Sequence, residues 1–190
     1  CALGGERGEG VEAQCATLQA PENHDAPKGR KIALAVAMIP AKSQTRSDPL
    51  VLIAGGPGQS IIESYPMLHP ALEDVRRNRN ILLIDARGTG GSHPLQCDEL
   101  TSLDETAVES EDPALLRTLT ERCRDRLAKT SDLRFYATAD HLRDLDLLRA
   151  TIGVEQLNLA GISYGTRVAQ QYAARFPKHT RTVLLDSVAP

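Results

Sequence analysis

Apolar residues along the chain fall into short runs that alternate with longer, mixed segments. The short runs predict strands buried on both faces, at 50–53, 81–84, 157–161 and 182–186. The longer segments are predicted to be helices, at about 60–77, 138–152 and 164–176. Strands that alternate with helices indicate an α/β fold, with a mostly parallel sheet covered by helices on both faces.

Two further regions depart from this alternation. Strand-length runs at 12–20 and 30–39 are separated by the turn-rich stretch PENHDAPKG, which predicts an N-terminal hairpin. Residues 93–137 are predicted to be an excursion from the sheet. The whole chain, 1–190, is otherwise read as part of one domain, because its length suits a single core.

The helix predicted at 138–152 has recognisable ends. Thr138 is expected to be its N-cap, and Gly153 is expected to stop it. Helical spacing also predicts which apolar side chains face inward, namely Leu142, Leu145, Leu148 and Ile152.

A serine between two glycines stands where a predicted strand meets a predicted helix. Gly161-Ile162-Ser163-Tyr164-Gly165 matches the G-x-S-x-G nucleophile elbow, a sharp turn that strains the backbone of the serine. The residues two before and two after the serine crowd each other in such a turn, so both must be glycine. The alternative is a tight connection without chemistry. We favour Ser163 as a nucleophile, with the N–H of Tyr164 facing a developing oxyanion.

A glycine-rich loop follows the strand predicted at 50–53. Elbow hydrolases take a second oxyanion N–H from a loop in this position. Pro57 has no N–H, so the donor must be Gly55, Gly56 or Gly58, of which we favour Gly56. A glycine turn without a catalytic part is the alternative.

Four motifs together resemble a known family. In order they are GGPG, DARGTGGS, GISYGTR and VLLDSVAP, and they are similar to the serine aminopeptidase branch of the α/β-hydrolases. That branch contains prolyl iminopeptidases and secreted tripeptidyl aminopeptidases. The resemblance implies an α/β-hydrolase fold, an acyl-enzyme on Ser163, and an oxyanion hole made by Gly56 and Tyr164. The implied substrate is a peptide with a free N-terminus. Asp85 and Arg87 receive no catalytic role and are expected to have structural partners.

The chain does not offer a complete catalytic triad. A serine needs a histidine base oriented by a carboxylate, in the chain order Ser, Asp or Glu, His. After Ser163 only Asp186 and His179 are available, in reverse order, and His179 is expected at the opposite edge of the sheet. His93 is expected nearer the correct rim, as a loop residue.

The family resemblance implies that an acid, a histidine and a lid lie in a C-terminal part outside these 190 residues. The chain is therefore predicted to be the N-terminal portion of a longer hydrolase and inactive by itself. Two other functions fit the same residues: an esterase or lipase-like hydrolase of this fold, and a non-catalytic binding domain. Ala54 stands where many iminopeptidases have histidine, which argues against a strict proline-releasing specificity.

The four cysteines are Cys1, Cys15, Cys97 and Cys123. Cys123 belongs to the apolar stripe of a predicted helix, so it faces inward and suits a disulfide with Cys97; Cys1 and Cys15 would then tie down the N-terminus. That stripe consists of Leu115, Leu119, Cys123 and Leu127. Four reduced thiols in a cytosolic protein are one alternative, and a lipid anchor on Cys1 is another. Resemblance to secreted members of the family favours disulfides and a secreted or periplasmic bacterial location.

Composition narrows the partners. A net charge of -3 gives no reason to expect nucleic acid, and no apolar run approaches the length of a membrane span. The cysteine and histidine spacings match no metal motif, so neither a metal nor another cofactor is expected.

Overall fold

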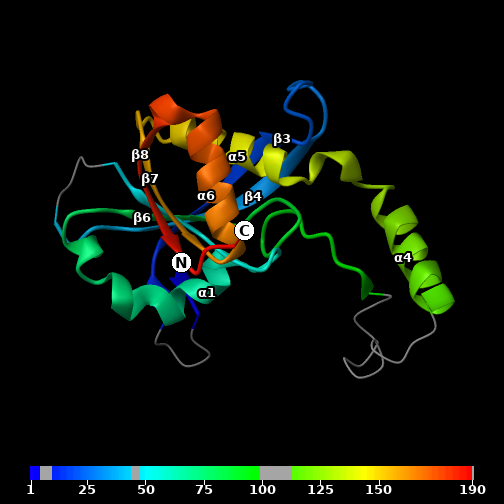
Figure 1. Cartoon of the computed structure of the whole chain (residues 1–190), viewed down its shortest axis with the longest axis horizontal. Coiled ribbons are helices and arrows are strands. Elements are labelled where there is room, and N and C mark those ends of the chain that lie inside the picture. The colour runs from blue at the N-terminus through cyan, green and yellow to red at the C-terminus, as the bar shows by residue number, and fades with distance from the viewer. Residues whose placement is uncertain (5–9, 44–47, 99–112, 190) are drawn as a thin grey trace. The chain divides into compact units, whose positions relative to one another are not determined.

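The computed structural model describes residues 1–4, 10–43, 48–98 and 113–189 (Figure 1). The chain forms two compact units, which are described separately below. The first unit comprises Cys1–Pro94 and Ala137–Pro190, and the second comprises Leu95–Tyr136. The excursion predicted at 93–137 falls partly outside the described residues.

A six-stranded sheet with the order β3-β4-β6-β5-β7-β8 forms the centre of the first unit (Figure 1). The strands are β3 (Gln14–Pro21), β4 (Lys31–Ile39), β5 (Leu50–Ile53), β6 (Ile81–Ile84), β7 (Leu157–Ile162) and β8 (Thr180–Asp186). β3 and β4 form an antiparallel hairpin, and β4 also runs antiparallel to β6. β6, β5, β7 and β8 are parallel to one another. The predicted α/β architecture, with its N-terminal hairpin, is confirmed.

Both faces of the central strands are covered. All four residues of β6 are buried, although their side chains alternate between the two faces of the sheet. On one face Leu52, Ile81 and Leu83 pack in a cluster with Ile61 and Tyr65 of helix α1 (Ile61–Leu68). Helix α6 (Tyr164–Arg175) packs on β5, β7 and β8, and helix α5 (Thr138–Thr151) packs on α6 and β3.

The helical stretch predicted at 60–77 is shorter and more broken than expected. α1 ends at Leu68, and two 3-10 turns follow, η1 (His69–Leu72) and η2 (Val75–Arg77). Pro70 lies in the first of these turns and has no N–H for an α-helical hydrogen bond, which explains why α1 does not continue.

Helix α5 corrects two details of the prediction. Thr138 is its first residue rather than its N-cap, and the Asp140 carboxylate accepts the N–H of Ala137 at 3.2 Å. The Thr138 hydroxyl is engaged elsewhere, because it hydrogen-bonds the hydroxyl of Tyr164. Ile152, expected to face inward, lies just beyond the helix and is 42% exposed. Gly153 does end the helix, with the positive φ of 74° that favours glycine.

A disulfide and a helix define the second unit. Helix α4 (Pro113–Leu127) carries Cys123, which is buried and joined to Cys97 with a Cα–Cα distance of 5.4 Å. The predicted apolar stripe of this helix is only partly buried, since Leu115 is exposed. A short 3-10 turn, η3 (Leu133–Phe135), follows α4.

The N-terminus is also tied down by a disulfide. Cys1 is joined to Cys15 of β3 with a Cα–Cα distance of 5.9 Å. Between these cysteines, β1 (Ala2–Leu3) and β2 (Val11–Glu12) form a small antiparallel sheet. No helix in the described parts of the chain is long and apolar enough to cross a membrane.

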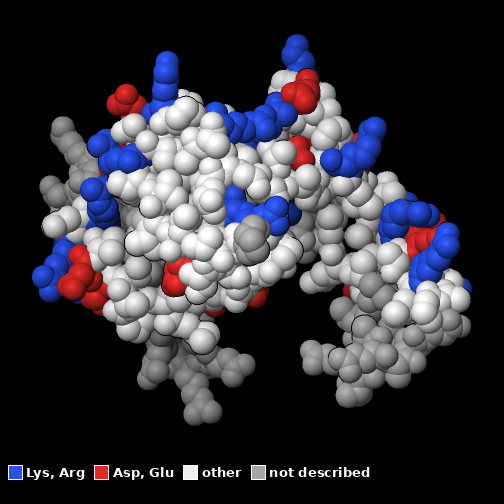
Figure 2. Space-filling view, viewed as in Figure 1, with Lys and Arg blue, Asp and Glu red and all other residues white. Residues whose placement is uncertain are grey.

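The last strand lies at the open edge of the sheet. β8 pairs only with β7 in the strand order, and its apolar side chains are exposed, among them Val183, Leu184 and Leu185. Figure 2 shows a largely uncharged surface where β8 lies in the same view of Figure 1.

Candidate active site

Ser163 lies at the turn between the end of β7 and the start of α6. Its backbone has φ 53° and ψ -120°, a conformation that residues with a side chain rarely adopt. The residue is exposed, and its hydroxyl makes no cap hydrogen bond to the helix. The strained turn therefore presents a free hydroxyl to solvent at the carboxyl end of a central strand, where parallel sheets concentrate their chemistry.

The two glycines of the elbow are required by close backbone contacts. A Cβ added to Gly161 would overlap the carbonyl oxygen of Gly165, as the crowding predicted from the sequence requires. A Cβ added to Gly165 would overlap the carbonyl oxygen of Ile53 at the end of β5. The start of α6 therefore sits directly on the central strand, which fixes the position of Ser163.

Hydrogen bonds from the end of β8 hold the turn from the other side. The N–H of Ser163 donates to the carbonyl oxygen of Asp186 at 2.9 Å. The hydroxyl of Thr166, which is fully buried, donates to the carbonyl oxygen of Ser163 at 2.6 Å and accepts the N–H of Ala189 at 3.0 Å. Asp186 thus contributes its backbone to the elbow, while its carboxylate accepts the Ser187 hydroxyl at 3.1 Å.

The glycine-rich loop after β5 lies against the serine. A Cβ built on Gly55 would be 3.1 Å from the Cβ of Ser163, a tight contact that glycine avoids. Gly56 has φ 103° and is joined to Pro57 by a cis peptide bond. Tyr164 is the first residue of α6, so the helix itself makes no use of its N–H. The glycine-rich loop and the first residue of α6 therefore both lie next to Ser163.

No histidine among the described residues is hydrogen-bonded to Ser163. His179 precedes β8, and the register that pairs Leu157 with Thr180 and Ile162 with Asp186 places it at the opposite end of the sheet. His93, in the loop after β6, has φ 49°. The other histidines have partners elsewhere or are buried. The Nε2 atom of His24 is hydrogen-bonded to the Asp144 carboxylate at 2.8 Å, and the Nδ1 atom of His69 is hydrogen-bonded to the Tyr65 hydroxyl at 3.1 Å. His141 is buried in α5.

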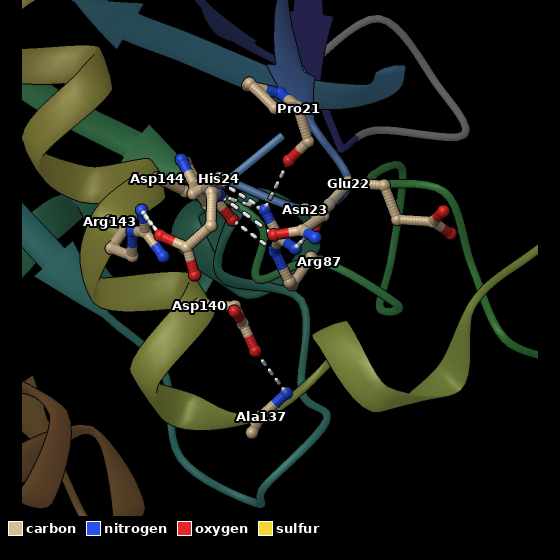
Figure 3. Close-up of polar contacts among 10 residues, drawn as sticks. Pro21, Glu22, Asn23, His24, Arg87, Ala137, Asp140, Arg143 and Asp144 are labelled. Carbon is tan, nitrogen blue, oxygen red and sulfur yellow. Dashed lines mark hydrogen bonds and ion pairs between the residues drawn. The ribbon is translucent and has the colours of Figure 1, made fainter. Parts of the chain in front are cut away.

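Arg87, from the DARGTGGS motif, has a structural partner that the sequence did not reveal. Its guanidinium forms two hydrogen bonds with the Asp144 carboxylate, at 2.7 and 2.6 Å, and also donates to the carbonyl oxygens of Pro21 and Glu22 (Figure 3). Burial disfavours the charge of Asp144, but hydrogen bonds from Arg87 and His24 outweigh it and lower the pKa of this carboxyl. The network joins α5 to the turn of the hairpin.

Asp85 from the same motif also has structural partners. Its carboxylate accepts the Ser60 hydroxyl, the N–H of Ile62 in the first turn of α1 and the N–H of Gly91 in the loop after β6. Across the described residues, no group of three or more His, Cys, Asp or Glu side chains has the arrangement of a metal site.

A family model described as the alpha/beta hydrolase fold matches residues 48–190. The chain belongs to the α/β-hydrolase fold family. The matched residues of this α/β-hydrolase chain include the glycine-rich loop after β5, the serine turn and the four parallel strands.

Curated relatives of this α/β-hydrolase chain carry hydrolase names. It is 32% identical over 186 residues to serine protease Hip1 of Mycobacterium tuberculosis. The matched region covers 92% of this chain and 35% of that protein. It is 31% identical over 192 residues to tripeptidyl aminopeptidase of Streptomyces coelicolor, with 92% and 35% covered. It is 34% identical over 187 residues to carboxylesterase B of M. tuberculosis, with 92% and 36% covered.

The solved structures agree on the fold. A crystal structure of proline iminopeptidase from Mycobacterium smegmatis matches with a TM-score of 0.55 at 16% identity, covering 88% of this chain and 42% of that one. At this identity the likeness shows the fold alone. The chain spans about a third of the length of the curated relatives it matches, as the 35% coverage states. Relatives of these kinds support a hydrolase function.

Proposed function

We propose that the protein containing this chain is a serine hydrolase that cleaves peptide bonds near a free N-terminus through an acyl-enzyme on Ser163. The observation that carries the proposal is the strained, exposed Ser163 between two glycines that cannot be replaced without overlap. A strained residue of this kind is found where the surrounding structure enforces it for function. Relatives named as a serine protease and a tripeptidyl aminopeptidase support the substrate class.

The reaction follows from the groups at the rim. The Ser163 oxygen attacks the carbonyl carbon of the substrate while its proton passes to a histidine base, and the carbonyl oxygen becomes an oxyanion. The N–H groups of Gly56 and Tyr164 stabilise that negative charge. Collapse of the intermediate breaks the C–N bond, releases the amine with the proton from the base, and leaves an ester on Ser163. Water then hydrolyses the ester.

The base and its carboxylate are proposed to come from a part of the protein outside these 190 residues. No described histidine binds the serine, and the chain spans only about a third of its relatives, at 35% coverage. The same C-terminal part is proposed to supply the lid that holds the free amine of the substrate, and to cover the exposed side chains of β8.

The test uses full-length protein, amino-acyl and tripeptidyl anilides, and short acyl esters. Ser163→Ala should lower kcat by about 10⁴-fold or more, because no nucleophile remains. Ser187→Ala is the matched control, since Ser187 is also an exposed serine with positive φ at the same rim, and it should retain activity. Full turnover by Ser163→Ala would overturn the proposed mechanism. Absence of turnover of all these substrates by the full-length wild type would instead favour a non-catalytic binding domain.

A second candidate is an esterase of the same fold, and the relative named carboxylesterase B favours it. The two substrate classes share the nucleophile and the oxyanion hole, so Ser163→Ala does not separate them. The ratio of kcat/KM on anilides to that on esters does. Activity confined to the esters would replace the peptidase proposal with the esterase one.

We also propose that the protein is exported from a bacterial cell. Both cysteine pairs form disulfides, which persist in oxidising compartments and are rare in the cytosol. Mass mapping of the native protein without reductant should find Cys1–Cys15 and Cys97–Cys123. Four alkylatable thiols would contradict export.

A further inference from the structure

A buried carboxylate, Asp85, lies beside the proposed oxyanion loop. It follows β6 at the sheet edge that carries Ser163, and only 2% of the residue is exposed. The carboxylate accepts the Ser60 hydroxyl at 2.9 Å, the N–H of Ile62 at 3.2 Å and the N–H of Gly91 at 3.0 Å. One side chain therefore joins the loop after β6 to the start of α1.

The loop after β6 closes tightly on this carboxylate. A Cβ added to Gly90, which has φ 46°, would overlap the Asp85 oxygen that accepts the N–H of Gly91. The same Cβ would be 2.9 Å from the Cβ of Ser60. Gly90 thus allows the backbone to lie against both Asp85 and Ser60, so the carboxylate has little freedom to move.

Ser60 transmits this restraint to helix α1. Its oxygen accepts the N–H of Glu63 at 3.1 Å as the N-cap of the helix, while its hydroxyl hydrogen points to Asp85. Asp85 also holds the first turn directly, through the N–H of Ile62. The start of α1 is consequently fixed by a buried carboxylate in the loop after β6.

The proposed oxyanion loop is the segment 54–59, which runs from the end of β5 to Ser60. The segment begins at the end of β5, which is fixed between β6 and β7 in the sheet. It ends at Ser60, whose hydroxyl is hydrogen-bonded to Asp85. Gly55, inside this segment, lies close to Ser163, since a Cβ built on it would be 3.1 Å from the Ser163 Cβ. A shift at the start of α1 would therefore move the Gly56 N–H relative to Ser163.

We infer that Asp85 is a positioning residue for the oxyanion loop. It touches neither the nucleophile nor the substrate, and acts by fixing the distance between the Gly56 N–H and the oxygen that becomes negative. The inference rests on the proposed function, because it presumes a reaction at Ser163. Misplacing a catalytic group by about 1 Å can lower a rate by about 10²-fold.

Asp144 provides the matched control. It is also fully buried and held by several hydrogen bonds. Its partner Arg87 lies in the loop after β6, as Asp85 does, but donates to Pro21 and Glu22 of the hairpin, whereas Asp85 binds Ser60 at the end of the oxyanion loop. Asp85→Asn and Asp144→Asn keep the volume of the side chain and remove the same charge. Both should lower the melting temperature, and only Asp85→Asn should change the chemistry.

The experiment measures acylation of full-length protein by a tripeptidyl anilide in single turnover, at a temperature well below unfolding. Asp85→Asn should lower the acylation rate constant by about 10- to 100-fold and leave the affinity for a product peptide within about 2-fold, because the oxyanion exists only in the transition state. A tripeptidyl aldehyde, which forms a tetrahedral adduct with serine, should lose affinity in parallel with the rate.

Ser60→Ala covers the case in which Asp85→Asn does not fold. It keeps the carboxylate and its backbone donors but breaks the link to the loop, and it should slow acylation by a smaller factor, about 3- to 10-fold. Equal acylation rates in wild type, Asp85→Asn and Ser60→Ala would overturn the inference while leaving the proposed function intact. An equal loss in Asp144→Asn would also overturn it, since the effect would then follow stability alone. If Ser163→Ala itself acylates normally, the proposed function fails and the inference fails with it.

Discussion

Both ends of the parallel sheet carry polar side chains, but these differ in how they are hydrogen-bonded. At the carboxyl end, the Ser163 hydroxyl is exposed and no described side chain binds it. At the amino end, the Asp146 carboxylate accepts hydrogen bonds from Arg149 at 2.8 Å, His179 at 2.6 Å and Tyr172 at 3.1 Å. An aspartate, a histidine and a hydroxyl thus meet at the end that has no nucleophile elbow.

The difference shows that residue types alone do not make a catalytic site. The donors around Asp146 outweigh its burial and lower the pKa of its carboxyl, so the group is stable as an anion and already satisfied. Ser163 is held by its backbone, and its side chain is left for a substrate and a base. The following predictions test this contrast between a satisfied cluster and an open elbow.

The largest effect is expected from removing the rest of the protein. Isolated residues 1–190 should react with a fluorophosphonate about 10²- to 10⁴-fold more slowly than full-length protein, because general-base assistance has this magnitude. Adding a separately expressed C-terminal part should restore labelling if the two parts associate. Fast labelling of the isolated chain would show that a base lies within it and would return attention to His93 and Asp186.

The next effect concerns the close packing of the elbow. Gly165→Ala should cost about 3 kcal/mol or more in free energy of unfolding, since its Cβ would overlap backbone atoms of β5 that cannot move aside. Gly153→Ala is the control: φ is 74° there but no atom lies within 4 Å of a Cβ, so only about 1 kcal/mol of conformational strain is expected. Urea unfolding measures both. Equal costs would contradict the role given to packing.

A smaller effect is expected at Thr166. Thr166→Val keeps the shape but leaves the Ala189 N–H without its acceptor, which should cost about 1–2 kcal/mol and slow labelling of Ser163. Thr166→Ser keeps the hydroxyl and should restore most of the labelling rate. A Val variant that labels at the wild-type rate would show that the end of β8 does not position the elbow.

The smallest effect is the pH dependence of the amino-end cluster. Because the folded pKa of Asp146 is lowered from 3.8, its charge stabilises the fold above that pH, and the benefit is lost as the pH falls through the lowered value. Asp146→Asn should therefore be about 1 kcal/mol less stable than wild type at pH 7, with the gap narrowing below about pH 4. Unfolding curves at both pH values measure it, and kcat at pH 7 should not change. A stability difference between wild type and Asp146→Asn that grows as the pH falls would contradict a lowered pKa for Asp146.

Local signals in the sequence predicted much of the fold. Buried strands, the hairpin and the elbow are each determined by residues close together in the chain. The two glycines of G-x-S-x-G, for example, are the residues that must approach each other in the turn. The same holds for Gly153, whose left-handed conformation ends α5 as predicted.

The prediction for Thr138 was wrong, and the partners of Arg87 and Asp85 were not identified, because the residues that bind these groups are distant in the chain. Thr138 has a hydroxyl suited to an N-cap, but Tyr164, 26 residues later, binds it instead. The partner of Arg87 lies 57 residues away in Asp144, so no spacing rule could identify it. Asp85 likewise accepts a hydrogen bond from Ser60, 25 residues earlier, and the sequence contains no signal for this pairing.

The order of the cysteines has a consequence for how the chain acquires its covalent links. Among the four cysteines of this chain, the first pairs with the second and the third with the fourth, with separations of 14 and 26 residues. Each bond can therefore close as soon as its second cysteine emerges from a ribosome or translocon, before a wrong partner is available. Oxidation of these four cysteines in their order along the chain therefore gives the pairs seen in the structure without exchange between them.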